Sequence, residues 1–236
     1  MPLNKATGNM FTWLTHTHTH LGGECPHKCP YCLVRSLCKK WPVLNQKYSG
    51  PVKIIEKELD VPYGEGKIIF VENLNDIACA TDADARLILA HAGKYPKNHY
   101  VFQTKNPAWY LGFMHLIPDH SVLGCTIETN RFGWLKEHGC LAPEPIDRAM
   151  VMADIHRHFP KQKTFITVEP VMDFDVEVLA GFILAAKPDF LNLGADSKNN
   201  NLPEPSIEKI EALVAALAKG GIEPREKGNL ERLRKT

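Results

Sequence analysis

Short apolar runs rich in β-branched residues alternate with segments of helical spacing along most of the chain. This alternation predicts strands that are each followed by a helix. The expected strands are Phe11–His20, Lys67–Glu72, His99–Gln103, Ser121–Ile127, Thr164–Glu169 and Phe190–Gly194. Successive β–α units predict a parallel sheet with right-handed crossovers, and six units are too few for a complete eight-stranded barrel. The expected fold class is therefore α/β.

The helical segments between these strands have recognisable starts and stops. Helices are expected over Tyr31–Trp41 and over Asp82–Tyr95, where Thr81 is the N-cap, and a short helix begins at Asn106-Pro107. The inward faces expected for three later helices are Ile146, Ala149, Met150 and Ala153; Val176, Leu179, Ala180, Ile183 and Leu184; and Ile207, Ile210, Val214 and Leu217.

The composition changes this picture little. With 236 residues, 44% of them hydrophobic, the chain is long enough for one sizeable core. We expect a single domain over residues 1–236, with an irregular insert at 45–66 and a C-terminal tail at 222–236. The net charge is +1, from 28 basic and 27 acidic residues, so no long-range attraction to nucleic acid is indicated.

Targeting features are equally sparse. The N-terminus lacks the apolar stretch of a signal peptide, and the longest apolar run, Val178–Ala186, is too short to cross a bilayer. Seven cysteines, an odd number, without a secretion signal indicate a reducing compartment. We therefore expect a cytoplasmic protein without a membrane segment, or one in the host cytoplasm if the chain is viral.

The most informative motif is the run Cys25-Pro-His-Lys-Cys29-Pro-Tyr-Cys32, a C-x3-C-x2-C spacing with no fourth cysteine nearby. Iron–sulfur clusters usually take four thiolates, so three would leave one iron of a [4Fe–4S] cluster open to another ligand. This spacing resembles the motif of radical S-adenosylmethionine (radical SAM) enzymes. The motif also follows the first expected strand, where the cluster loop of that superfamily lies. The resemblance implies the radical SAM fold, an open partial (βα)6 TIM-like barrel of parallel strands.

A structural zinc site is the alternative interpretation of these cysteines. His27, or a histidine of the preceding Thr-His-Thr-His-Thr-His run, would then be the fourth ligand. Zinc sites normally come as two separated ligand pairs, and here there is one triplet without a partner pair. The four other cysteines are scattered without ligand spacing, and we expect them to be structural: Cys38, Cys79, Cys125 and Cys140.

Polar residues gather where five of the expected strands end. In barrels of parallel strands the chemistry collects at the carboxyl ends of the strands. The clusters are Glu72-Asn73-Leu74-Asn75-Asp76, Gln103-Thr104-Lys105-Asn106, Thr126–Arg131, Glu169–Asp173 and Asp196-Ser197-Lys198. Some of these residues serve as helix caps and turn formers. Others offer what an amino acid joined to adenosine needs: acceptors for an ammonium, donors for a carboxylate, and a carboxylate or amide for a ribose.

Further strings sharpen the resemblance to a family of small radical SAM proteins found in bacterial viruses, bacteria and archaea, and the similarity covers nearly the whole chain. These strings are Thr-Gly-Asn-Met near the start, Gly22-Gly-Glu-Cys-Pro-His, Phe102-Gln-Thr-Lys-Asn-Pro, Thr126-Ile-Glu-Thr-Asn-Arg, Glu169-Pro-Val-Met-Asp-Phe and Gly194-Ala-Asp-Ser. Two positions depart from the family. His18-Thr19-His20 stands where members tend to have Thr-Trp-Asn-Pro, and Leu33 stands where many have tyrosine.

The histidine run is open to two interpretations. Strand alternation places His16, His18 and His20 on one face, where they form either a metal or proton-transfer site or part of a polar face that lines the barrel. A single strand rarely supplies every ligand of a metal. The polar face is therefore the favoured interpretation.

The resemblance implies an enzyme that uses a [4Fe–4S] cluster to cleave SAM reductively and then abstracts a substrate hydrogen through a 5′-deoxyadenosyl radical. Cys25, Cys29 and Cys32 are the implied cluster ligands. The implied cofactor-binding residues are Tyr31 at the adenine, Asn73 and Asn75 at the methionine ammonium, Lys105 at its carboxylate and Glu128 at the ribose, together with Gln103. Arg131, Glu169, Asp196 and Lys198 remain for the substrate as the expected catalytic set.

The viral relatives imply that the substrate is a nucleobase in DNA, for example an amino-acid-modified thymine of phage DNA that is rearranged or isomerised. Alternatives among enzymes are a repair lyase resembling spore photoproduct lyase and a peptide-modifying radical SAM enzyme. A zinc-stabilised binding module is the alternative outside enzymes. The expected partners are DNA or a nucleotide and a one-electron reductant of the flavodoxin or ferredoxin type.

Overall fold

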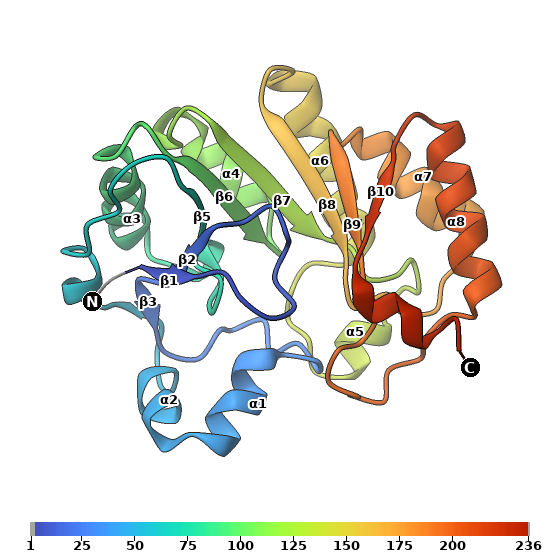
Figure 1. The fold of residues 1–236 in the computed structure, drawn as a ribbon, viewed down its shortest axis with the longest axis horizontal. Helices are drawn as coiled ribbons and strands as arrows, with labels where there is room; N and C mark the ends of the chain where they lie inside the picture. Colours follow the sequence, from blue (N-terminus) through green and yellow to red (C-terminus); the bar gives the residue numbers. More distant parts are fainter. Residues whose placement is uncertain (1–2, 236) are drawn as a thin grey trace. The chain divides into compact units, whose positions relative to one another are not determined.

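The computed structural model describes residues 3–235, which form two compact units (Figure 1). The first unit comprises Met1–Lys28, Cys32–Thr104 and Trp109–Val122, and the second comprises Cys29–Tyr31, Lys105–Ala108 and Leu123–Thr236. Two short segments, one of them inside the cysteine motif, therefore belong to the second unit although their neighbours in sequence belong to the first. The expectation of a single domain stays a prediction.

The sheet strands run in the order β1-β2-β5-β6-β7-β8-β9-β10. Their bounds are β1 (Asn4–Lys5), β2 (His16–His18), β5 (Ile68–Val71), β6 (His99–Thr104), β7 (Ser121–Thr126), β8 (Lys163–Val168), β9 (Phe190–Leu193) and β10 (Pro224–Glu226). β1 pairs with β2 antiparallel, whereas β2–β5, β5–β6, β8–β9 and β9–β10 are parallel. The predicted α/β class with a mostly parallel sheet is confirmed.

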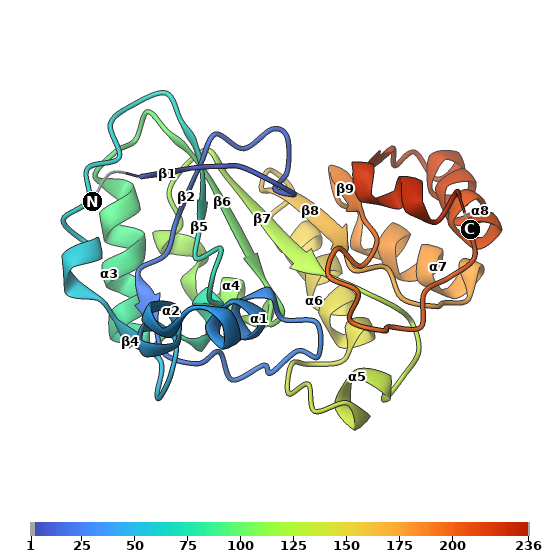
Figure 2. The ribbon, with the colours of Figure 1, turned by 60° about the horizontal axis from the view of Figure 1, so that its bottom comes forward.

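The first unit contains most of the N-terminal elements. They are α1 (Leu33–Lys40), α2 (Pro42–Lys47), α3 (Asp82–Gly93) and the 3₁₀ turns η1 (Glu56–Glu58), η2 (Ile77–Cys79) and η3 (Met114–Leu116), with the antiparallel pair β3 (Leu21–Gly22) and β4 (Lys53–Ile54). Helices α1 and α2 lie side by side (Figure 2). α3 begins as predicted, because the Thr81 hydroxyl accepts a hydrogen bond from the Asp84 amide at 3.1 Å. Tyr100 of β6 donates to the Ala92 carbonyl of α3 at 2.7 Å.

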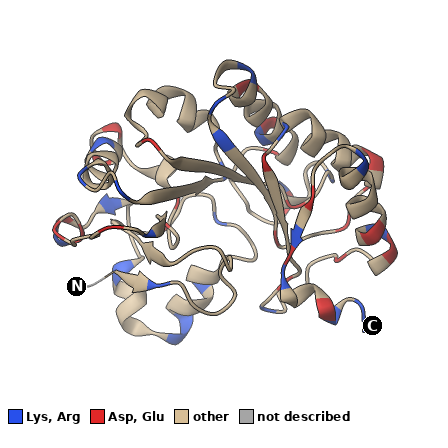
Figure 3. Ribbon diagram, turned by 45° about the horizontal axis from the view of Figure 1, so that its top comes forward, with Lys and Arg blue, Asp and Glu red and all other residues tan. Residues whose placement is uncertain are grey.

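The second unit contains the C-terminal helices. They are α5 (Trp134–Glu137), α6 (Pro145–His158), α7 (Val176–Ala186), α8 (Ile207–Lys219) and the 3₁₀ turn η4 (Gly228–Arg232). Helix α4 (Ala108–Phe113) starts at the last residue of a segment of this unit. Charged residues of both signs are interspersed along α6 and α8 (Figure 3). Strand β8 has Phe165, Ile166 and Val168 fully buried, as expected for a parallel strand that is covered on both faces.

Three expectations differ from the structure. The first strand is shorter than predicted, since only His16–His18 pair in the sheet from the range Phe11–His20. The C-terminal segment expected as a tail contains β10, which pairs with β9, and the turn η4. The face predicted for α6 is partly wrong, because Met150 is 63% exposed whereas Arg148 is buried.

No helix among residues 3–235 has the length and apolar character that a membrane-spanning segment needs.

Candidate functional site

The first cysteine of the motif lies in a group of metal-type ligands in the first unit. One ligand atom each from Cys25, His27 and Cys79 lies within 4.8 Å of the others. The Cys79 sulfur is 3.7 Å from His27 Nε2. A hydrogen bond with Cys79 lowers the pKa of Cys25. The thiolate that this favours is the form of cysteine that binds metals.

Asp76 fixes this group from the loop after β5. Its Oδ2 is 3.1 Å from His27 Nε2, and its Oδ1 accepts from the Thr104 hydroxyl at 2.6 Å and from the Ala78 amide at 3.0 Å. The carboxylate is almost buried and is held by the end of β6 and by the turn η2, so the His27 ring has a defined orientation. Orientation of a ligand by a second carboxylate is common in metal sites.

The remaining predicted residues of the first unit lie at strand ends. Asn73 accepts from the Thr19 hydroxyl at 2.9 Å, and the Asn75 amide donates to the Gly23 carbonyl at 3.2 Å. Gln103 is half-buried near the end of β6, and Cys32 is the half-buried N-cap residue of α1. Asn75 therefore ties the loop after β5 to the start of the cysteine loop.

The second cysteine of the motif, Cys29, is buried in the second unit, where its sulfur lies 3.8 Å from the sulfur of Cys140. All seven cysteines are free thiols. The sequence could not reveal this pair, because 111 positions separate its two members.

A buried charge network lies next to Cys29 in the second unit. Lys105 Nζ donates to Glu128 Oε1 at 2.7 Å and to the Tyr31 hydroxyl at 2.8 Å, and the Tyr31 hydroxyl donates to the same carboxylate oxygen. Arg148 Nη1 donates to Glu128 Oε2 at 2.8 Å and to the Thr126 carbonyl at 2.9 Å. Three side chains thus share one carboxylate whose exposure is 0%.

The network fixes the charges of its members. Burial alone would raise the pKa of Glu128, but the cations of Arg148 and Lys105 outweigh burial and lower that pKa to about 2. Burial would likewise lower the pKa of Lys105, and the neighbouring Glu128 carboxylate raises it instead. Burial and then the same carboxylate raise the pKa of Tyr31, so its phenol keeps the proton that it donates. Lys105 therefore presents a buried, charged ammonium that is held by the Glu128 carboxylate and the Tyr31 hydroxyl.

Arg131 is part of an ion-pair network at the end of β7. Its Nη2 lies 2.9 Å from Asp173 Oδ2 and its Nη1 lies 2.5 Å from Asp175 Oδ2. Lys209 of α8 approaches the other oxygen of Asp173 at 2.5 Å. Asp175 is the N-cap residue of α7, but its side chain makes no cap bond and binds Arg131 and Asn130 instead.

The other predicted substrate residues have different surroundings. Glu169 is half-buried and its Oε2 is 2.8 Å from Lys227 Nζ. The Asp196 carboxylate accepts from the Lys198 amide at 3.0 Å and from the Asn200 side chain at 2.6 Å, which is the pattern of a turn-forming aspartate. The Lys198 side chain is exposed.

Sequence reasoning gave no specific site role to four residues of these groups: Asp76, Cys79, Cys140 and Arg148. A signal existed for the last of them. Pro145, Arg148, Ala149, Met152 and Ile155 form one helical stripe, and a cation inside such a stripe indicates a buried partner. The cysteines had no such signal, because spacing along the chain does not report sulfurs that meet through folding.

The donor set fits an iron–sulfur cluster and SAM. Cys25, Cys29 and Cys32 form no disulfide, and a hydrogen bond lowers the pKa of Cys25, whereas the contact with Cys140 and burial raise the pKa of Cys29. The Lys105 ammonium is a cation that suits a carboxylate, and the aromatic ring of Tyr31 lies next to it.

Comparison with known proteins identifies solved structures with a similar fold. No family model matches the chain, and no curated protein matches it. Among solved structures it is similar to spore photoproduct lyase and to SuiB of Streptococcus suis, which are radical SAM enzymes. A spore photoproduct lyase variant with bound AdoMet and dinucleoside spore photoproduct has a TM-score of 0.56 at 11% identity, over 92% of this chain and 66% of that chain. A second variant has a TM-score of 0.62 at 10% identity, over 94% of this chain and 80% of that one.

SuiB bound to S-adenosylmethionine has a TM-score of 0.56 at 9% identity, over 90% of this chain and 50% of that chain. The chain thus spans just under two thirds of the first lyase structure, at 66%, and half of SuiB. Identities this low show the fold alone. The chain has the α/β fold of these enzymes, an open partial TIM-like barrel of mostly parallel strands.

Proposed function

We propose that the chain is a radical SAM enzyme. The observation that carries this proposal is the C-x3-C-x2-C motif, three free thiols that follow the first parallel strand of a fold whose solved neighbours hold SAM. Cys25, Cys29 and Cys32 would hold a [4Fe–4S] cluster, which supplies the electron that cleaves bound SAM into methionine and a 5′-deoxyadenosyl radical. A reducing cytoplasm and a one-electron reductant of the flavodoxin or ferredoxin type suit this role.

The residues of the second unit bind and orient in this proposal. The positive charge of Lys105 attracts the SAM carboxylate, and Tyr31 packs near the adenine. Glu128 has three of its about four acceptor positions occupied by Tyr31, Lys105 and Arg148. It is therefore first a positioning residue, which keeps Lys105 charged and directed, and its expected contact with the ribose stays a prediction.

In the first unit, Asn73 and Asn75 supply oxygens for the methionine ammonium, with Gln103 as a further polar group. Both asparagines lie on the loop after β5, and Asn75 also holds the start of the cysteine loop through Gly23. This bond is to the backbone of Gly23 and not to a cysteine, so a substitution of Asn75 should affect the SAM site more than the cysteine ligands.

For the substrate, we propose a nucleobase, such as a modified thymine in phage DNA. The support is that a spore photoproduct lyase structure of this fold contains a dinucleoside spore photoproduct. Arg131, Glu169, Asp196 and Lys198 are the proposed substrate residues. Arg131 and Lys198 are exposed enough to meet an anionic group, whereas the Asp196 carboxylate shapes the loop that carries Lys198. A repair lyase and a peptide-modifying enzyme are the competing activities.

The test is anaerobic reconstitution with iron and sulfide, followed by reduction with SAM. We expect about four irons per chain and release of 5′-deoxyadenosine. Cys29→Ala should lose both, while Cys38→Ala, a half-buried thiol on α1 outside the motif, should keep both. Full 5′-deoxyadenosine release by Cys29→Ala would refute the proposal.

The group of Cys25, His27 and Cys79 also supports a second candidate, a zinc-stabilised binding module. Zinc with mixed thiolate and imidazole ligands is a common structural site. The same reconstitution separates the two functions. One zinc per chain, no bound sulfide and no reaction with SAM would favour the module.

A further inference from the structure

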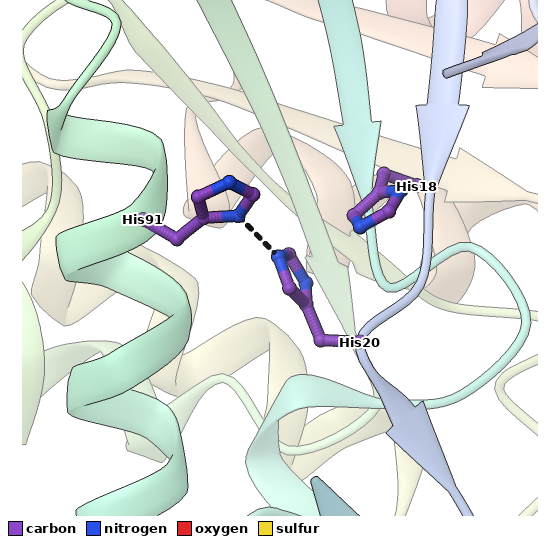
Figure 4. A group of neighbouring side chains, drawn as sticks. All are labelled: His18, His20 and His91. Atoms are coloured by element: carbon purple, nitrogen blue, oxygen red, sulfur yellow. Dashed lines mark hydrogen bonds between the residues drawn. The ribbon is translucent and has the colours of Figure 1, made fainter. Parts of the chain in front are cut away.

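Three histidines of the first unit meet in its core. His18 comes from β2, His20 from the stretch between β2 and β3, and His91 from α3, and Figure 4 shows the three rings directed toward one another. One ring nitrogen from each lies within 4.8 Å of the others. Their exposures are 3%, 0% and 1%. His16, which was expected on the same face, contacts the Thr15 hydroxyl at 2.9 Å and does not join this group.

The outer nitrogens of two rings are held by acceptors. His20 Nδ1 is 2.7 Å from Glu72 Oε1, and His91 Nε2 is 3.0 Å from the Val61 carbonyl. Both acceptors need a proton on the nitrogen that they contact. In neutral rings the remaining nitrogens, His20 Nε2 and His91 Nδ1, then carry only lone pairs. These two atoms are 2.8 Å apart, so their lone pairs repel each other unless a proton or a metal ion binds there.

The charge around the histidines leads to the same requirement. The Glu72 carboxylate is buried and also accepts from the amides of His20 at 2.8 Å and Leu21 at 3.2 Å. Among residues 3–235, its only ionisable contact is His20. A buried carboxylate is costly without a nearby cation.

We propose that His18, His20 and His91 form a closed binding site for one zinc-type divalent cation. Imidazole nitrogens suit zinc, and structural zinc sites are closed and tetrahedral. The contacts of Glu72 with His20 and of Val61 with His91 are the outer-shell bonds that orient ligating histidines. Zinc–nitrogen bonds of about 2.0–2.1 Å in tetrahedral geometry place ligand nitrogens about 3.3 Å apart, so His20 and His91 would separate by about half an ångström.

Further ligands are at hand. The Tyr63 hydroxyl is 3.1 Å from His20 Nε2. His18 Nε2 is 3.1 Å from the Glu58 carbonyl oxygen and 3.9 Å from the Glu58 carboxylate. The ion would join residues 18–20, which end five residues before Cys25, to helix α3. It would therefore be a structural ion of the first unit, separate in its ligands from the cysteine motif and independent of the proposed SAM chemistry. A single proton shared by His20 and His91 is the rival explanation.

The experiment uses the cluster-loaded protein, freed of other metals with a chelator and then titrated anaerobically with Zn²⁺. Metal analysis and zinc-edge X-ray absorption are measured on the wild type, on His91→Gln and on His99→Gln, an exposed histidine of the same unit. We expect one zinc per chain with nitrogen and oxygen ligands in the wild type and in His99→Gln. His91→Gln should bind zinc at least tenfold more weakly.

The absorption spectrum of the wild type keeps the test decisive even if His91→Gln does not fold. Sulfur ligands around the zinc would assign the ion to Cys25 and Cys79 and overturn the proposal. So would a wild type that binds no zinc, or a folded His91→Gln that keeps full affinity. A zinc-free wild type whose ring ¹⁵N signals show one proton between His20 and His91 would establish the rival explanation.

Discussion

Replacing Glu128 by glutamine should cost the second unit much of its stability, because it leaves the Arg148 and Lys105 charges without their carboxylate. The folded pKa of about 2, against 4.5 for a free carboxyl, corresponds to about 3 kcal/mol of stabilisation at neutral pH. Removing one partner of a buried ion pair costs about 3–5 kcal/mol, which agrees. We therefore expect the free energy of unfolding to fall by about 3 kcal/mol.

The assay is guanidinium unfolding at pH 7 of the wild type, Glu128→Gln and Glu211→Gln, an exposed glutamate of α8. The control should unfold like the wild type. The depressed pKa also predicts a pH dependence: the contribution of Glu128 is complete above about pH 4.5 and is lost as the pH falls toward about 2. Glu128→Gln should lack this component. A variant within about 0.5 kcal/mol of the wild type at pH 7 would refute the reasoning.

Three further outcomes are expected. Gly124→Ala places a Cβ 2.1 Å from the ring of Phe165, so thermal unfolding should show a loss of about 1–3 kcal/mol, and an unchanged melting temperature would contradict this packing. Asn75→Ala should weaken SAM binding roughly ten- to hundred-fold in calorimetry while the cluster spectrum stays unchanged; unaltered affinity would argue against this cofactor position. Arg131→Ala and Lys198→Ala should slow substrate turnover but not uncoupled 5′-deoxyadenosine release, and wild-type turnover in both would exclude an anionic anchor.

Most of the fold could be predicted because its strands are nearly continuous apolar runs. Ile69 to Val71 and Phe165 to Val168 are recognisable as buried strands from composition alone. Strand β10 could not be found this way, because Pro224-Arg225-Glu226 has no apolar residue and is held by backbone pairing to β9.

The candidate site was less predictable, because its contacts join residues far apart in the chain. Lys105 and Glu128 could be identified from the sequence, because residues at the carboxyl ends of neighbouring parallel strands are expected to lie close together. Arg148 was missed because charged residues of a helix are normally expected to face solvent. Arg148 is buried because it pairs with the buried carboxylate of Glu128. His91 was missed for a related reason: it belongs to a different element from the histidine run that it meets.

The second unit is built from three separate stretches of the chain, and this limits where the protein can be truncated or split into fragments. A fragment that starts at Leu123 contains Glu128 and Arg148 but lacks Tyr31 and Lys105, so the buried carboxylate would lose two of its three side-chain partners. Tyr31 precedes Glu128 by 97 positions, so this core is complete only after much of the chain has been synthesised. Such long-range closure slows folding. Split reporters and domain truncations should therefore keep residues 29–31 and 105–108 with the C-terminal part, which a deletion that extends to Leu123 does not do.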